Sequence, residues 1–99
     1  MPQIESEIKE KVILEPPKKY HVIIHNDDVT PMGFVVEILV EIFNMETKDA
    51  IALMLEIHTK GKGIAGTYIK SIAESKVTLV RDVAMKAEYP LTATIEIAE

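Results

Sequence analysis

Residues 24–34, IHNDDVTPMGF, mark the place where the chain changes from one kind of structure to another. A β-branched apolar run ends there, an amide and two carboxylates follow, and Thr30-Pro31 opens a second apolar run. Thr is favoured at the N-cap of a helix and Pro at its first position. The stretch therefore predicts a strand-to-helix turn in which Thr30 caps the helix and Asp28 supports the turn. This leaves Asn26 and Asp27 available to a ligand.

The spacing of apolar residues on both sides of this turn predicts the other elements. Alternation indicates strands, and apolar residues three and four apart indicate helices. Ser71 and Glu74 form the pattern of a capping box, and Gly61 is a natural helix stop. In order, we expect a strand over 20–25, a helix from 30 to 43, a helix from 47 to 60, a strand from about 63 to 69, a helix from 71 to 88 and a strand over 91–97.

This order predicts an α+β fold of topology β-α-α-β-α-β. A three-stranded, mainly antiparallel sheet with three helices packed on one face is the economical way to bury the apolar stripes. The inner face of the second helix is expected to hold Ala50, Ile51, Met54, Ile57 and His58. Pro16-Pro17 interrupts regular structure. We therefore expect a flexible extension over 1–18, with Ile4, Ile8 and Val12 at helical spacing, and one folded domain over 19–99.

Composition excludes several classes of function. The 99 residues carry a net charge of −5 and contain no cysteine. Nucleic-acid modules need a basic face, so a phosphate backbone is not an expected partner. Thiolate chemistry is excluded, and the apolar runs are too short to span a bilayer. We expect a cytoplasmic protein that binds neither nucleic acid nor membrane, and a cationic ligand fits its charge.

Metal binding and catalysis find little support in the sequence. Four residues along a strand would place His21 and His25 about 13 Å apart, too far for one ion. The combination of His25, Asp27 and His58 has no familiar ligand spacing, and neither a phosphate loop nor a nucleophile elbow is present. We expect no metal, no cofactor and no enzymatic activity. A small metal-dependent hydrolase is the weakest of the alternatives.

A small binding pocket is the better interpretation of the turn. Asn26, Asp27 and His58 offer hydrogen-bond acceptors, although Asn and Asp are also common in turns and a lone His is more often structural. Met32, Val35, Met54 and Ile57 offer an apolar wall, although methionines also fill cores. Together they suit a ligand with an ammonium group beside a bulky apolar side chain, such as the first residue of a peptide.

The same residues resemble the ClpS adaptor family. The matching stretches are NDDVTPMGFV (26–35), LMLEIHTKGKGIAG (53–66), AESKV (73–77) and YPL (89–91), and the resemblance covers residues 19–98 in order. Proteins of this family are not enzymes. They bind N-degrons whose first residue is Leu, Phe, Tyr or Trp, and deliver them to a Clp-family AAA+ unfoldase, ClpA or ClpC, that works with the ClpP protease.

The resemblance also implies roles for individual residues. Asn26, Asp27 and His58 match the positions that bind the peptide α-amino group. The matching pocket wall consists of Thr30, Met32, Val35, Met54, Ile57 and Leu91, with Met32 as the gatekeeper against β-branched first residues. Glu74 and Lys76 match positions on the helix that faces the unfoldase. The N-terminal extension matches the segment that is offered to the unfoldase, and a monomer is expected.

Three positions depart from the family pattern, and the change at Ala65, where the family often has Cys, is mild. Gly33 stands where the family usually has Glu, so the helix start loses a capping box with Thr30, worth roughly 0.5–1 kcal/mol. A looser first turn would loosen Met32 and weaken its gatekeeping. Ser71 stands where an acid is common. A rival interpretation is a protein-binding module like the C-terminal domain of the ribosomal stalk protein, which shares the topology but presents a basic face.

Overall fold

The computed structural model describes residues 16–99, so the first fifteen residues of the predicted extension lie outside the described residues. Residues 16–18 form no regular structure, and the chain then runs through six elements. In order, these are β1 (Lys19–His25), α2 (Met32–Glu41), α3 (Thr47–Lys60), β2 (Lys62–Ile69), α4 (Lys70–Lys86) and β3 (Thr92–Ala98). The predicted order of elements is confirmed.

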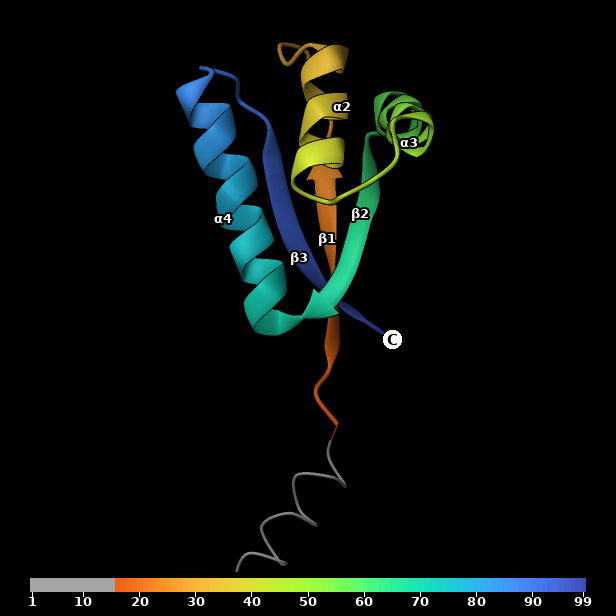
Figure 1. The fold of residues 1–99 in the computed structure, drawn as a ribbon, viewed down its shortest axis with the longest axis vertical. Coiled ribbons are helices and arrows are strands. Elements are labelled where there is room, and N and C mark those ends of the chain that lie inside the picture. The colour runs from red at the N-terminus through yellow and green to blue at the C-terminus, as the bar shows by residue number, and fades with distance from the viewer. Residues whose placement is uncertain (1–15) are drawn as a thin grey trace, which may run out of the picture.

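The three strands form one antiparallel sheet with β1 in the middle, in the order β2-β1-β3. The helices cover one face of this sheet, with α2 in front of β1 and α4 beside it (Figure 1). The predicted α+β class, topology and single helical layer are therefore confirmed. Both strand pairs are antiparallel, so the sheet contains no parallel pair.

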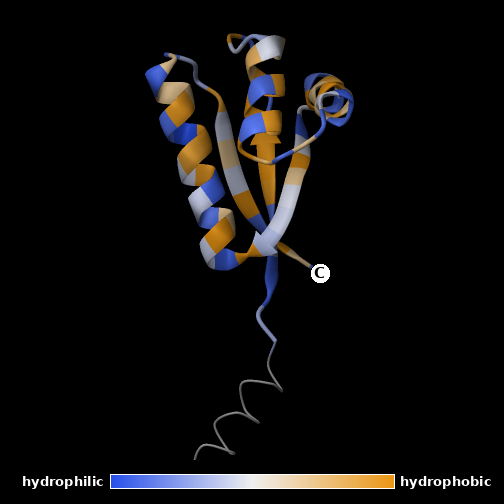
Figure 2. Ribbon diagram, viewed as in Figure 1, coloured by the Kyte–Doolittle hydropathy of each residue, from blue (hydrophilic) through white to orange (hydrophobic). Residues whose placement is uncertain are grey.

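The core forms where β1 meets the helices. Val22 and Ile24 are fully buried beneath the helical layer, and apolar segments of the helices turn toward the sheet (Figure 2). β-branched side chains suit such a strand because they pack well on a pleated surface. The helices add small or branched residues at helical spacing, namely Val35, Ile38, Leu39, Ala50, Ile57, Ala73, Val80 and Ala84. This packing fixes β1, and therefore fixes where the turn after His25 begins.

Several predicted helix details are wrong. α4 begins at Lys70, directly after β2, so Ser71 lies inside the first turn and forms no capping box. Instead, the hydroxyl of Ser75 donates to the carbonyl of Ser71 at 3.0 Å. The reason is tertiary, because Ile69 is held by its pairing with Lys19 and leaves no room for a capping loop.

Helix boundaries and faces also differ from the sequence pattern. α2 ends at Glu41, two residues before the predicted end, and α3 begins at Thr47 with Glu46 as its N-cap residue. Ile51 is 42% exposed and His58 is exposed, so the inner face of α3 is narrower than predicted. α3 projects past the edge of the sheet, which leaves one side of the helix uncovered (Figure 1).

Lys76 joins α4 to the end of α2. Its ammonium donates to the carbonyl of Ile42 at 2.6 Å and lies 5.9 Å from the ring centre of Phe43 and 5.7 Å from that of Tyr68. The last turn of α2 has no basic residue of its own, so Lys76 supplies the cation that favours a helix C-terminus. This contact holds the connection between α2 and α3.

Replacing Gly by Ala should change the free energy of unfolding in opposite directions at Gly33 and Gly61. Nothing lies within 4 Å of a Cβ at Gly33, whereas Gly61 has a φ of 94°. We expect Gly33→Ala to raise the free energy of unfolding by about 0.5 kcal/mol, since Gly is unfavourable in a helix. Gly61→Ala should lower it by about 1 kcal/mol, since L-residues strain in the left-handed region. Urea denaturation measures both changes, and effects of the same sign would contradict this interpretation.

Removing the Lys76 contact should destabilise the fold. We expect Lys76→Met to lower the free energy of unfolding by about 1–2 kcal/mol, because a charged hydrogen bond and two cation–aromatic contacts are lost. Lys70→Met, at an exposed position on the same helix, serves as the matched control and should change it by less than about 0.5 kcal/mol. Equal effects of the two substitutions would show that the contact with Ile42 contributes nothing.

Candidate functional site

The turn between β1 and α2 is organised by the side chain of Asp27. One carboxylate oxygen accepts hydrogen bonds from the backbone N–H groups of Val29 at 2.8 Å and Thr30 at 2.7 Å. The other oxygen accepts from the hydroxyl of Thr30 at 2.7 Å. Asp favours turns for this reason, because its short side chain satisfies backbone donors two and three residues ahead.

This geometry corrects two predictions. Thr30 does not cap the helix, since Pro31 occupies the N-cap position of α2 and no side-chain cap bond forms. The hydroxyl of Thr30 is directed to Asp27 instead. Asp27, rather than Asp28, supports the turn, so Asp27 has a structural role that the sequence analysis assigned to its neighbours.

The same contacts set the charge state of Asp27. Partial burial raises the pKa of its carboxyl group, but the hydrogen bonds from Thr30 and Val29 lower it by more. The resulting pKa lies below the ordinary value for Asp. Hydrogen bonds to the ionised form produce this direction of shift because they stabilise the charge. The turn therefore holds a carboxylate that stays ionised throughout the neutral pH range.

A cavity of about 330 Å³ opens between this turn, the first turn of α2 and the second half of α3. Its lining consists of Asn26, Asp27, Asp28, Val29, Thr30, Pro31, Met32, Val35, Met54, Ile57 and His58. The backbone N–H of Asn26 donates to the carbonyl of Gly61 at 2.9 Å, which ties the turn to the end of α3. Asn26 therefore lies where the turn meets α3, and it lines the cavity.

The cavity brings together eight of the nine residues that the sequence analysis assigned to a ligand. Leu91 is the exception, because it is buried in the core at 4% exposure and does not line the cavity. Val29 lines the cavity and was missed, although it is an apolar residue in an otherwise polar turn and is 65% exposed. That mismatch between residue type and surroundings is the sequence signal for it.

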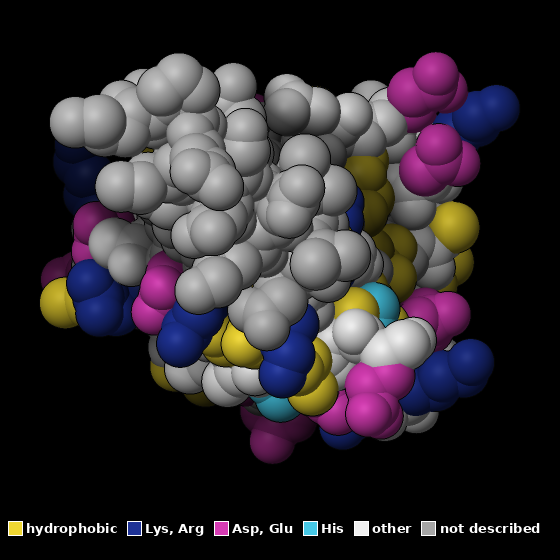
Figure 3. Space-filling model, turned by 90° about the horizontal axis from the view of Figure 1, so that it is seen from below, with side chains coloured by type: hydrophobic (Ala, Val, Ile, Leu, Met, Phe, Trp, Pro, Cys, Tyr) yellow, Lys and Arg dark blue, Asp and Glu magenta, His cyan; other side chains and the backbone are white. Residues whose placement is uncertain are grey.

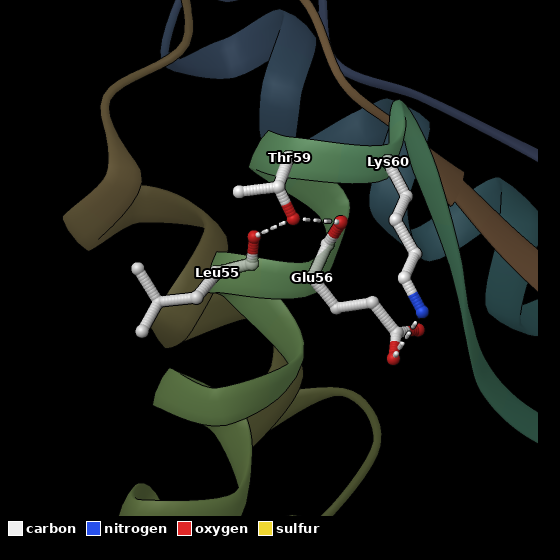
Figure 4. Close-up of polar contacts among 4 residues, drawn as sticks. All are labelled: Leu55, Glu56, Thr59 and Lys60. Carbon is white, nitrogen blue, oxygen red and sulfur yellow. Dashed lines mark hydrogen bonds and ion pairs between the residues drawn. The ribbon is translucent and has the colours of Figure 1, made fainter.

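Side-chain contacts within α3 surround the part of the helix that carries Ile57 and His58 (Figure 4). The hydroxyl of Thr59 donates to the carbonyls of Leu55 at 2.9 Å and Glu56 at 3.3 Å. Lys60 lies 3.8 Å from the carboxylate of Glu56, one turn earlier. Gly61 then ends the helix with its N–H bonded to the carbonyl of Ile57 at 2.9 Å. The bond at Gly61 therefore ends α3 beside the cavity, whereas the exposed ion pair and the hydroxyl bonds contribute little to stability.

The lining determines which ligands fit. Carboxylate, amide and imidazole groups lie on the side formed by Asp27, Asn26 and His58, and no Lys or Arg lines the cavity. Met32, Val35, Met54 and Ile57 supply apolar surface. Its volume is at the lower end of the range for ligand pockets. The arrangement suits one cationic group attached to one apolar group.

The other histidines lie elsewhere. His21 shares a hydrogen bond of 2.8 Å with the hydroxyl of Thr67, and His25 one of 2.7 Å with that of Thr94. Among residues 16–99, no three His, Asp or Glu side chains gather in a way that could hold a metal ion. No helix in this part of the chain is long and apolar enough to cross a membrane.

The surface carries both signs of charge. The two residues that the sequence analysis assigned to the unfoldase, Glu74 and Lys76, both lie on α4. Basic and acidic side chains alternate around the described part of the face seen from below, without a continuous basic field (Figure 3). Glu74 is exposed and lines a second cavity of about 260 Å³ with Val77, Thr78 and Ile95. Lys76 is partly buried by its contact with Ile42.

Removing the Asp27 carboxylate should destabilise the protein at neutral pH. We expect Asp27→Ala to lower the free energy of unfolding by about 1–2 kcal/mol, because two backbone donors and a hydroxyl lose their acceptor. Since the folded-state pKa is depressed, this contribution is present above the unfolded-state pKa of about 3.9 and is lost as the pH falls through the folded value. Asp28→Ala is the matched control, and chemical denaturation at pH 7 and pH 3 measures both.

The difference between wild type and Asp27→Ala should therefore shrink in acid, while Asp28→Ala stays close to wild type at both pH values. An Asp27→Ala protein as stable as wild type at pH 7 would contradict the structural role of this carboxylate.

Comparison with known proteins identifies the family. The family model described as ATP-dependent Clp protease adaptor protein ClpS matches residues 15–94. The ATP-dependent Clp protease adapter protein ClpS of Vibrio cholerae is 46% identical over 88 residues, which are 89% of this chain and 83% of that protein. The protein of the same name from Acetivibrio thermocellus is 50% identical over 80 residues, 81% of each chain.

A solved structure agrees with the sequence comparisons. The structure of Agrobacterium tumefaciens ClpS2 bound to L-phenylalaninamide superposes with a TM-score of 0.81 at 32% identity, over 84% of this chain and 100% of that one. The family match runs from before β1 into the first residues of β3 and includes every residue that lines the cavity beside Asp27. The chain belongs to the ClpS family of Clp protease adaptor proteins.

Proposed function

We propose that this chain is a non-enzymatic adaptor that binds N-degrons through the cavity beside Asp27. The first residue of the degron, Leu, Phe, Tyr or Trp, would place its side chain in the cavity and its α-amino group at the rim. The observation that carries the proposal is the lining, which sets three acceptors next to apolar walls without a competing cation. L-phenylalaninamide, bound by the related ClpS2, has the same combination of an amino group and a bulky apolar side chain.

The count of donors and acceptors supports the assignment of the amine site. An ammonium group has three N–H donors, and Asn26, Asp27 and His58 offer one acceptor group each. A carboxylate has about four acceptor sites, and the bonds from Val29 and Thr30 occupy three of those of Asp27. One site remains for the ligand. A hydrogen bond between two charged groups is among the stronger kinds that proteins form.

The apolar wall would select the first side chain. We assign the wall to Thr30, Met32, Val35, Met54 and Ile57. Met32 is 44% exposed and lies in the first turn of α2, at the edge of the cavity, where a gatekeeper would act. Gly33 follows it, and because Gly is unfavourable in a helix we expect a looser first turn and a looser exclusion of β-branched residues than with Glu at this position.

We further propose that the adaptor delivers its cargo to a Clp-family AAA+ unfoldase, ClpA or ClpC, in the cytoplasm and as a monomer. The core over 19–99 would carry the degron, and the extension over 1–18 would be offered to the unfoldase. Glu74 is exposed on α4 and is available for this contact. Lys76 would have to serve the contact while bonded to Ile42. The ribosomal-stalk interpretation is not favoured, since that module presents a basic face and this chain carries a net charge of −5.

Peptides that differ only in their first residue test the proposal. Fluorescent peptides beginning with Leu, Phe or Trp should bind with a Kd in the micromolar range or below, and acetylation of the Leu peptide should weaken binding at least tenfold. The reason is that the acetylated nitrogen carries no charge and only one N–H donor, and a lost charged hydrogen bond of about 1.5–3 kcal/mol corresponds to roughly 10- to 150-fold. Fluorescence anisotropy measures these values.

The control variant for this experiment is Gly33→Glu. It should bind the Leu peptide as well as wild type does, and discriminate more strongly against Ile and Val. Equal affinity for acetylated and free peptides would overturn the assignment of the amine site. Identical Leu-to-Ile ratios in the two proteins would remove the role given to Gly33.

A further inference from the structure

An exposed apolar stripe runs along α4 on a side that the fold does not use. Ile72 is 45% exposed, Leu79 48% and Val83 39%. The buried side of the same helix consists of Ala73, Val80 and Ala84. The stripe is therefore separate from the core, and apolar segments recur along the length of α4 (Figure 2).

The spacing of the stripe indicates what kind of surface would cover it. Ile72, Leu79 and Val83 are separated by seven and four positions, and Lys76 and Lys86 continue the alternation of fours and threes. Apolar residues at this spacing form a narrow, straight seam that fits the apolar side of a second helix. A helix is the expected occupant because a broader partner would need a wider patch.

The chain itself contains such a segment. Residues 1–15, which lie outside the described part of the structure, carry Ile4, Ile8 and Val12 at intervals of four. A helix through these residues would place all three on one side. Ile4 and Val12 would then be roughly 12 Å apart along the axis, while Ile72 and Val83 are separated by roughly 17 Å. The two apolar sides are of comparable length.

The attachment point of the segment favours this occupant. Lys19 pairs with Ile69, and α4 begins at the next residue. Only Pro16, Pro17 and Lys18 separate the segment from this point, a reach of roughly 10 Å when extended. The described chain therefore leaves the sheet at Lys19, close to the first turn of α4, which holds Ile72. A chain tethered this close has a high effective concentration at the stripe.

Charge complements the apolar match. The segment contains four glutamates (Glu5, Glu7, Glu10 and Glu15) against two lysines. Lys86 shares the side of α4 that carries the stripe, by the spacing given above, and Lys76, whose ammonium is bonded to Ile42, lies at the edge of that side. We propose that residues 1–15 pack reversibly on Ile72, Leu79 and Val83 of the same chain, as an amphipathic helix antiparallel to α4. This contact is independent of the degron cavity and does not rest on the proposed function.

Cysteine cross-linking tests the contact directly, because the chain has no cysteine of its own. The variant Ile8→Cys/Leu79→Cys is treated with a short thiol cross-linker and compared with Ile8→Cys/Arg81→Cys, whose second site is exposed on the opposite side of α4 at nearly the same level. We expect the first pair to cross-link within one chain at least tenfold faster. Equal rates, or products that join two chains only, would overturn the proposal.

A second measurement does not depend on introduced thiols. In the full chain, Leu79→Asp should shift the backbone amide NMR signals of residues 1–15, because it places a charge in the proposed contact. Met85→Asp, on the same helix at a position 67% exposed and away from the stripe, should leave them unchanged. Signals of the segment that respond to neither substitution, or equally to both, would overturn the proposal.

Discussion

The carboxylate of Asp27 is the contact on which the candidate site depends. Its bonds to the N–H groups of Val29 and Thr30 and to the hydroxyl of Thr30 close the turn between β1 and α2. The direction of α2, and with it the position of Met32, follows from that closed turn. The bond from Asn26 to the carbonyl of Gly61 joins the turn to α3 in the same way. Two short links therefore bring both walls of the cavity together.

This arrangement gives the side chain of Asp27 a structural role beside the binding role that we propose for it. The three hydrogen bonds orient the carboxylate and lower its pKa, which keeps the charge that an ammonium group would meet. A group fixed in place before the ligand arrives loses little freedom on binding. Lys76 is a second side chain of this kind, because it supports the end of α2 on the helix proposed to face the unfoldase.

The sequence predicted the fold and most of the residues that line the cavity because both depend on local sequence patterns. Alternation over 91–97 and helical spacing in the three helical segments depend only on residues close together in the sequence. The errors lie where distant residues decide. The hydroxyl of Thr30 could bond either the start of α2 or the carboxylate of Asp27, and it bonds Asp27. The start of α4 is set by the pairing of Ile69 with Lys19. The bond from Lys76 to Ile42 spans 34 positions and has no local signal.

The central claim is that Asp27 holds the turn and meets the ligand's ammonium group with the same carboxylate. Carbon-13 NMR titration of this carboxyl group, with and without L-phenylalaninamide, tests it most directly. In the free protein the pKa should lie below the ordinary value of about 3.9, and ligand should lower it further because a cation favours the ionised form. An ordinary pKa for Asp27 that ligand does not change would contradict the account.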